Sequence, residues 1–129
     1  MEHAPGPDAD EADEIRLTVP ALADFARVVR LAVSGLASRN GFAYDDVEDI
    51  RIAVGEVFGI LVDADDPRAR LRFSTRLSDE GLEVRAERVP PAPVAEASDL
   101  SDQILGAVVD SASVDAAHGT VALTKRFPS

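Results

Sequence analysis

The strongest constraint on the fold is an apolar stripe of helical period in the segment 45–61. Its members are spaced three or four residues apart: Val47, Ile50, Val54, Val57 and Leu61. A helix with one apolar face must bury that face against another layer of structure. The segment therefore predicts a long amphipathic helix. We predict Asp45 as its N-cap, with Glu48 completing a capping box.

A second stripe precedes the first and predicts a helix from Ala21 to about Arg39, ended by Asn40 and Gly41. Four further segments alternate apolar and polar residues, which is typical of half-buried strands. These are 15–19, 70–76, 82–86 and 120–126. The turn Asp79-Glu80-Gly81 joins the middle two as a hairpin. A third helix is predicted over 100–109 and a short strand over 113–117.

This order of elements predicts an α+β fold, a two-layer α/β sandwich. Three main helices would cover one face of a mixed, mostly antiparallel sheet. Residues 1–13 are rich in Pro, Ala, Asp and Glu and predict a disordered acidic tail. We expect a single domain over 14–127.

The charge balance limits the classes of partner. The chain has 24 acidic and 13 basic residues, a net charge of −11. This balance argues against direct binding of nucleic acid, because phosphate contacts need a Lys/Arg surface. It suits a basic protein partner, or it serves solubility alone. Cysteine is absent, which excludes disulfides and thiolate metal sites. No apolar run is long enough for a membrane and no signal pattern is visible, so we expect a cytoplasmic protein.

Four segments resemble one protein family: Arg16–Pro20 (RLTVP), Phe25–Arg39, Asp45–Glu56 (DDVEDIRIAVGE) and Gly119–Arg126 (GTVALTKR). They are similar to RsbW-type anti-sigma factors and serine-protein kinases, which have the histidine kinase-like (GHKL) ATPase fold. The resemblance spans roughly Ile15 to Phe127. It implies a homodimer that sequesters an alternative sigma factor of the stress or development type. It also implies release by an anti-anti-sigma antagonist of the STAS class, which intact members phosphorylate with ATP and magnesium.

The resemblance also locates the family's nucleotide site, which is degenerate in this sequence. Glu56 stands at the position of the general base. Ile60 stands where the family has a magnesium-binding Asn, and Ile60 offers no oxygen ligand. Asp63, one turn further on, is the alternative oxygen donor. Without magnesium the triphosphate charge is not neutralised for phosphoryl transfer.

Two further nucleotide motifs of the family are replaced. The stretch 86–93 (AERVPPAP) has neither the Asp nor the glycines of the adenine-binding motif, and Glu87 or Arg88 stands near the Asp position. Pro90 and Pro91 lack the flexibility of glycine. At the start of the third helix, Asp99 and Asp102 put carboxylates where phosphate would bind. We therefore expect no cofactor and no metal.

Glu56 has two interpretations. It is either a general base or an ordinary helix acid that pairs with Arg51 or Arg30, and the missing metal site favours the second. His3 and His118 show no partner acid or nucleophile, so no histidine chemistry is predicted.

The family resemblance places a sigma-factor contact at Arg27. Helical spacing puts Asp24, Arg30 and Ser34 near Arg27, on the outer face of the first helix. The alternative is that these arginines are solubilising residues paired with Asp24. We therefore predict an anti-sigma factor without ATP-dependent phosphorylation. A serine-protein kinase with a divergent ATP site is the second hypothesis, and a small-molecule sensor that uses the remnant pocket is the third.

Overall fold

The computed structural model describes residues 14–62, 66 and 68–128. The predicted tail over 1–13 and Asp63 lie outside these residues. The elements follow in this order: β1 (Glu14–Pro20), the 3-10 turn η1 (Ala23–Phe25), α2 (Ala26–Arg39), α3 (Tyr44–Leu61), β2 (Arg70–Ser78), β3 (Gly81–Val89), α4 (Asp99–Val108), β4 (Ser111–Asp115) and β5 (Thr120–Arg126).

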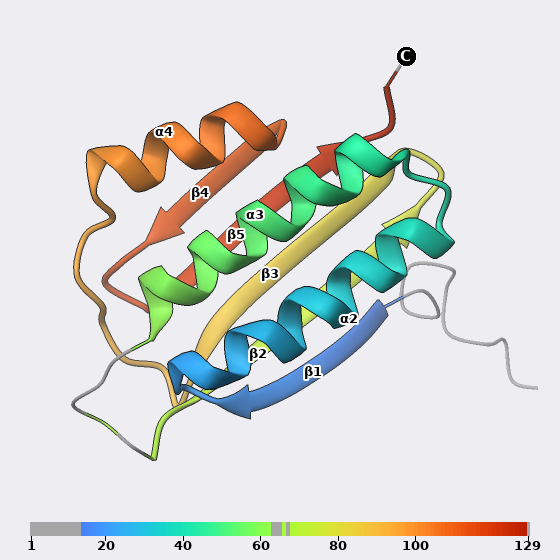
Figure 1. The fold of residues 1–129 in the computed structure, drawn as a ribbon. Helices are drawn as coiled ribbons and strands as arrows, with labels where there is room; N and C mark the ends of the chain where they lie inside the picture. The colour runs from blue at the N-terminus through green and yellow to red at the C-terminus, as the bar shows by residue number, and fades with distance from the viewer. Residues whose placement is uncertain (1–13, 63–65, 67, 129) are drawn as a thin grey trace, which may run out of the picture.

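The described strands form one five-stranded sheet in the order β1-β2-β3-β5-β4. The three α-helices lie on one side of this sheet, as Figure 1 shows. The predicted α+β two-layer sandwich is confirmed. Each neighbouring pair of described strands is antiparallel, so this part of the sheet is uniform rather than mixed.

The core lies between the sheet and the pair α2–α3. From α3, Ile50, Val54, Val57 and Leu61 are fully buried, which confirms the predicted inward stripe. The ring of Phe58 stacks on that of Phe73 in β2, with centroids 6.0 Å apart. Burial of side chains of this size is the main stabilising contribution to such a fold.

The helix starts differ from the predictions. The first helical segment begins as the 3-10 turn η1 and becomes α-helical at Ala26. The N-cap of α3 is Ala43, with no side-chain hydrogen bond, so the predicted Asp45 cap is wrong. Asp45 lies inside the first turn, where a carboxylate interacts favourably with the helix dipole. Glu48 pairs with Arg51 at 3.1 Å instead of closing a capping box.

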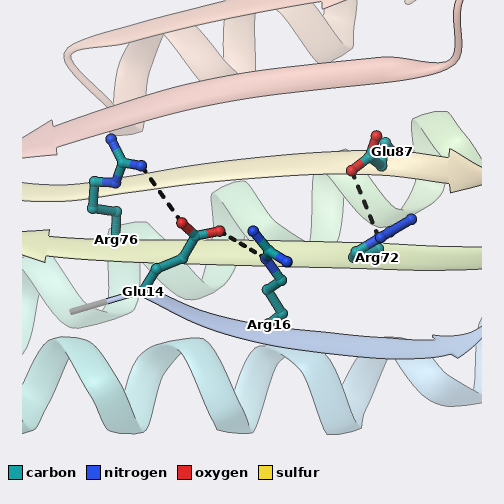
Figure 2. A network of polar contacts seen from close by, with 5 residues as sticks. All are labelled: Glu14, Arg16, Arg72, Arg76 and Glu87. Carbon is teal, nitrogen blue, oxygen red and sulfur yellow. Dashed lines mark hydrogen bonds and ion pairs between the residues drawn. The ribbon is translucent and has the colours of Figure 1, made fainter. Parts of the chain in front are cut away.

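The face of the sheet opposite the helices is polar. Figure 2 shows arginine and glutamate side chains of β1, β2 and β3 pairing across neighbouring strands on this face. Glu14 accepts from Arg16 at 2.9 Å and from Arg76 at 3.5 Å, and Arg72 lies 3.7 Å from Glu87. The hydrogen bond from Arg16, with the charge of Arg76 beside it, lowers the pKa of the Glu14 carboxyl below its ordinary value. Solvated pairs of this kind contribute little to stability individually.

Candidate functional site

The family's general-base position, Glu56, lies in the middle of α3 and faces α4. The hydroxyl of Ser101 in α4 donates a hydrogen bond of 2.6 Å to its Oε2 atom. Glu56 therefore pairs with a serine of the next helix, and the predicted pairing with Arg51 or Arg30 is not what the structure shows. Arg51 is engaged by Glu48. One oxygen of the candidate base is thus already occupied as an acceptor.

The N-terminus of α4 is capped from within the chain. The Ser98 side chain accepts a hydrogen bond of 3.0 Å from the backbone N–H of Ser101. Asp99 and Asp102 lie in the first helical turn, as predicted, but the capping residue is Ser98. The hydroxyl supplies the acceptor that the helix end needs. The two carboxylates add negative charge where a phosphate would need a positive one.

Arg88 lies in the region of the family's adenine-binding motif and is buried. Its side chain is 2% exposed, and Nη1 donates 3.2 Å to the backbone carbonyl of Leu61 at the end of α3. Nη2 lies 3.6 Å from the carboxylate of Asp66. The backbone N–H of Arg88 donates to the carbonyl of Gly119 at 2.9 Å. Arg88 therefore joins β3, the end of α3 and the turn before β5.

The other altered positions offer no set of metal or nucleotide ligands in the described part of the chain. Ile60 is partly buried and packs against the core. Pro90 and Pro91 are exposed. In the described part of the chain, no group of three or more His, Cys, Asp or Glu side chains is placed to hold a metal ion.

The predicted sigma-contact residues separate into two groups. Asp24 and Arg27 are exposed on η1 and α2, as expected. Arg30 is half-buried, and its side chain lies across Gly55 of α3, within 3.3 Å of the place a β-carbon would take. Ser34 is 8% exposed and donates to the Leu31 carbonyl, so its predicted place on the outer face is wrong. The buried face of α2 is wider than its apolar stripe, because α2 packs on both the sheet and α3.

Three exposed apolar residues near this face were missed by the sequence analysis. Val28 and Leu31 of α2 are 44% and 60% exposed, and Ile52 of α3 is 48% exposed. These three residues fall outside the predicted inward stripes, and this position in the sequence could have indicated that they are exposed. Leu31 lies next to Arg27 on the helix surface, since it is four residues further on, whereas Val28, the next residue after Arg27, points about 100° around the helix.

His118 differs from the prediction as well. Its Nδ1 atom lies 2.8 Å from a carboxylate oxygen of Asp115, so it does have a partner acid. The contact spans three residues of an exposed turn, which local sequence spacing could have indicated. It stabilises the turn between β4 and β5.

Two curated proteins similar to this chain are both serine-protein kinases named RsbW. The chain is 44% identical over 75 residues to the serine-protein kinase RsbW of Halalkalibacterium halodurans, a match that covers 57% of this chain and 46% of that protein. The chain is therefore similar in sequence to part of an RsbW serine-protein kinase. The RsbW of Bacillus cereus is 46% identical over 44 residues, which cover 34% of this chain and 28% of that protein. The chain thus spans less than half the length of these RsbW relatives. No family model matches.

Structure comparison agrees on the fold. The crystal structure of the RsbU and RsbW domains of a Mycobacterium tuberculosis protein superposes with a TM-score of 0.62 and 21% identity. The match covers 88% of this chain and 32% of that one. The two-layer α+β sandwich predicted from the sequence is therefore a fold that an RsbW domain also has. Among the described residues, no helix is both long and apolar enough to cross a membrane.

Proposed function

We propose that this RsbW-type chain is an anti-sigma factor that sequesters an alternative sigma factor of the stress or development type. A STAS-class anti-anti-sigma protein releases the sigma factor by competition, without ATP-dependent phosphorylation. The chain acts in the cytoplasm as a homodimer.

The outer face of α2 is the observation that carries this proposal. Arg27 is exposed there, and the exposed apolar side chain of Leu31 lies one helical turn further along the same face. An arginine beside an exposed apolar side chain is typical of a protein interface, because it combines bidentate contacts to carboxylates with buried apolar area. Asp24, also exposed, adds a group of opposite charge at the start of the same face.

The altered nucleotide region supports the part of the proposal that excludes phosphorylation. Ile60 supplies no oxygen for magnesium, and a hard divalent cation needs oxygen ligands. The guanidinium of Arg88 is bonded to the end of α3 and is 2% exposed, so it fills space beside the adenine-motif strand. Asp99 and Asp102 would repel phosphates at the start of α4.

Calorimetric titration of the protein with each alternative sigma factor of the host tests the anti-sigma role. We expect a stable complex with one of them, and we expect Arg27→Ala to weaken it by about tenfold or more, or ~1.4 kcal/mol or more. Arg39→Ala is the matched control, since Arg39 is an exposed arginine in the last turn of the same helix. No complex with any of the sigma factors, or equal affinity of both variants, contradicts the proposal.

The kinase hypothesis keeps one supporting observation, the retained Glu56. Titration of the protein with ATP and magnesium, together with an assay for phosphate transfer to the STAS protein, separates the two hypotheses. We expect no binding heat and no transfer. Transfer that is lost in Glu56→Gln would establish the kinase instead.

A further inference from the structure

Beside the last helix, the structure has a groove that the proposed sigma-binding face does not use. It runs between α4 and the edge strand β4, and has a volume of about 430 Å³. Figure 1 shows α4 lying along β4 at the end of the sheet farthest from β1. Its lining comes from the loop before α4, from α4 and its C-terminal end, and from β4, and includes Glu96, Asp102, Leu105, Gly106, Val109 and Val114.

The floor and the rim of this groove differ in chemistry. The buried side chains of Leu105 and Val109 and the half-buried Val114 form an apolar floor. Glu96, Asp102 and Asp110 are exposed and lie at the rim. No lysine or arginine is among the lining residues, all of which belong to the described part of the chain. The groove therefore combines apolar contact area with negative charge.

The strand beside the groove has an open edge. In the described sheet, β4 is the outermost strand and pairs with β5 on one side. An edge strand presents unpaired backbone N–H and C=O groups to another chain. Its sequence, Ser-Ala-Ser-Val-Asp, contains none of the Lys, Arg or Pro residues that commonly protect such edges. The opposite edge, β1, carries Arg16 and ends at Pro20.

We propose that this groove binds an extended peptide segment of a partner protein, in which Lys or Arg alternates with Val-sized apolar residues. The segment adds to β4 as a further strand, so its backbone bonds to the open edge. Because side chains of a strand alternate between its two faces, every second residue points toward α4 and the apolar floor. The basic residues point to the other face of the added strand, and the negative charge of Glu96, Asp102 and Asp110 attracts them across a distance of about a Debye length, ~8–10 Å. This surface is separate from Arg27, so the proposal does not depend on the sigma-binding role.

A groove-filling variant tests this assignment in the full chain. A β-carbon at Gly106 would meet no atom within 4 Å, and Gly106 lines the groove, so Gly106→Leu places a bulky apolar side chain there. Gly59→Leu is the matched control, because Gly59 is also helical, exposed and open around its β-carbon. Replacing a helical glycine removes a residue of poor helix propensity, so both variants are expected to fold.

The probe is a seven-residue capped peptide of alternating Lys and Val, titrated into the protein while amide NMR shifts are followed. We expect shifts confined to β4, α4 and residues 96–97, at least tenfold weaker binding by Gly106→Leu, and unchanged binding by Gly59→Leu. A Glu/Val peptide of the same length is expected not to bind. Asp102→Lys should weaken binding of the Lys/Val peptide several-fold, whereas Asp79→Lys, in the exposed hairpin turn, should not.

Three results would overturn the proposal. One is absence of binding at millimolar peptide, and another is equal binding by Gly106→Leu and the wild-type chain. The third is a concentration-dependent dimer in sedimentation that Gly106→Leu abolishes, which would assign the groove to a second copy of the chain. Loss of sigma-factor binding in Arg27→Ala with normal peptide binding would show that the two surfaces act separately.

Discussion

The α2–α3 pair and α4 lie on the same face of the sheet but are held there by different forces. Four residues of α2 and six of α3 are buried, whereas Leu105 alone is buried in α4. Polar contacts add to the burial of Leu105 in holding α4. Ser101 bonds to Glu56, and Lys125 Nζ donates 2.9 Å to the carbonyl of Val108 while lying 3.3 Å from Asp49.

This difference indicates where the molecule opens first. The stabilisation from apolar burial grows with the buried area, so several buried side chains together contribute a large free energy. A single hydrogen bond contributes only about 0.5–1.5 kcal/mol net. Regions with few buried apolar contacts open at lower free energy than the global unfolding reaction. The α4–β4 side is therefore the less stable part of the fold, and it also carries the peptide groove.

The largest expected effect comes from truncation in α3. Phe58→Ala removes a ring that is 2% exposed and stacked on Phe73, and should lower the free energy of unfolding by about 3–5 kcal/mol. Leu100→Ala in α4 is the control, because Leu100 is 65% exposed and its loss should change stability by less than about 0.5 kcal/mol. Urea unfolding measures both. Equal effects in the two helices would contradict the comparison.

A smaller effect is expected from Arg88, which joins β3 to the end of α3. Arg88→Met keeps most of the buried volume but removes the bonds to Leu61 and Asp66. We expect a loss of about 2 kcal/mol, since hydrogen bonds from charged donors are worth roughly 1.5–3 kcal/mol. Arg85→Met, on the exposed face of the same strand, should have little effect. A stability unchanged in Arg88→Met would mean that this arginine does not anchor the end of α3.

The smallest effect sharpens the comparison within α4. Ser101→Ala removes the hydroxyl that bonds to Glu56 and should cost about 1 kcal/mol. Because this bond attaches α4 to α3, amide hydrogen exchange should speed up in α4 and stay unchanged in α3. Ser113→Ala, an exposed serine of β4, is the control. An equal increase of exchange in α3 and α4 would contradict the inference that α4 opens independently of α3.

Periodic patterns in the sequence were sufficient to predict most of the fold. The strand 120–126 is observed with the predicted bounds, and the hairpin turn and the inward stripe of α3 are also confirmed. The short strand predicted over 113–117 is observed two residues earlier, as β4. Elements whose boundaries follow from the spacing of apolar and polar residues could be predicted from the sequence alone.

The site was less predictable, because its contacts join residues that are distant in the chain. The bond between Ser101 and Glu56 spans 45 positions, and no local rule gives it. Ser34 is buried because α2 also packs against α3, which its own apolar stripe does not show. The burial of Arg88 had a signal that was overlooked. Leu82, Val84 and Ala86 face inward in β3, and the same alternation continues to Arg88.

The turn before β5 has a consequence for engineering the proline-rich segment. Gly119 has a φ of +66°, and a β-carbon there would lie 2.2 Å from the carbonyl oxygen of Ala92 and 3.1 Å from Cδ of Arg88. Any side chain at 119 would collide with a backbone atom that cannot rotate away. A library that varies position 119 alone would therefore find it closed to substitution. A library that includes position 119 should also vary residues 89–97. A side chain at 119 needs space that the backbone at Ala92 now occupies, so the segment 89–97 has to move away.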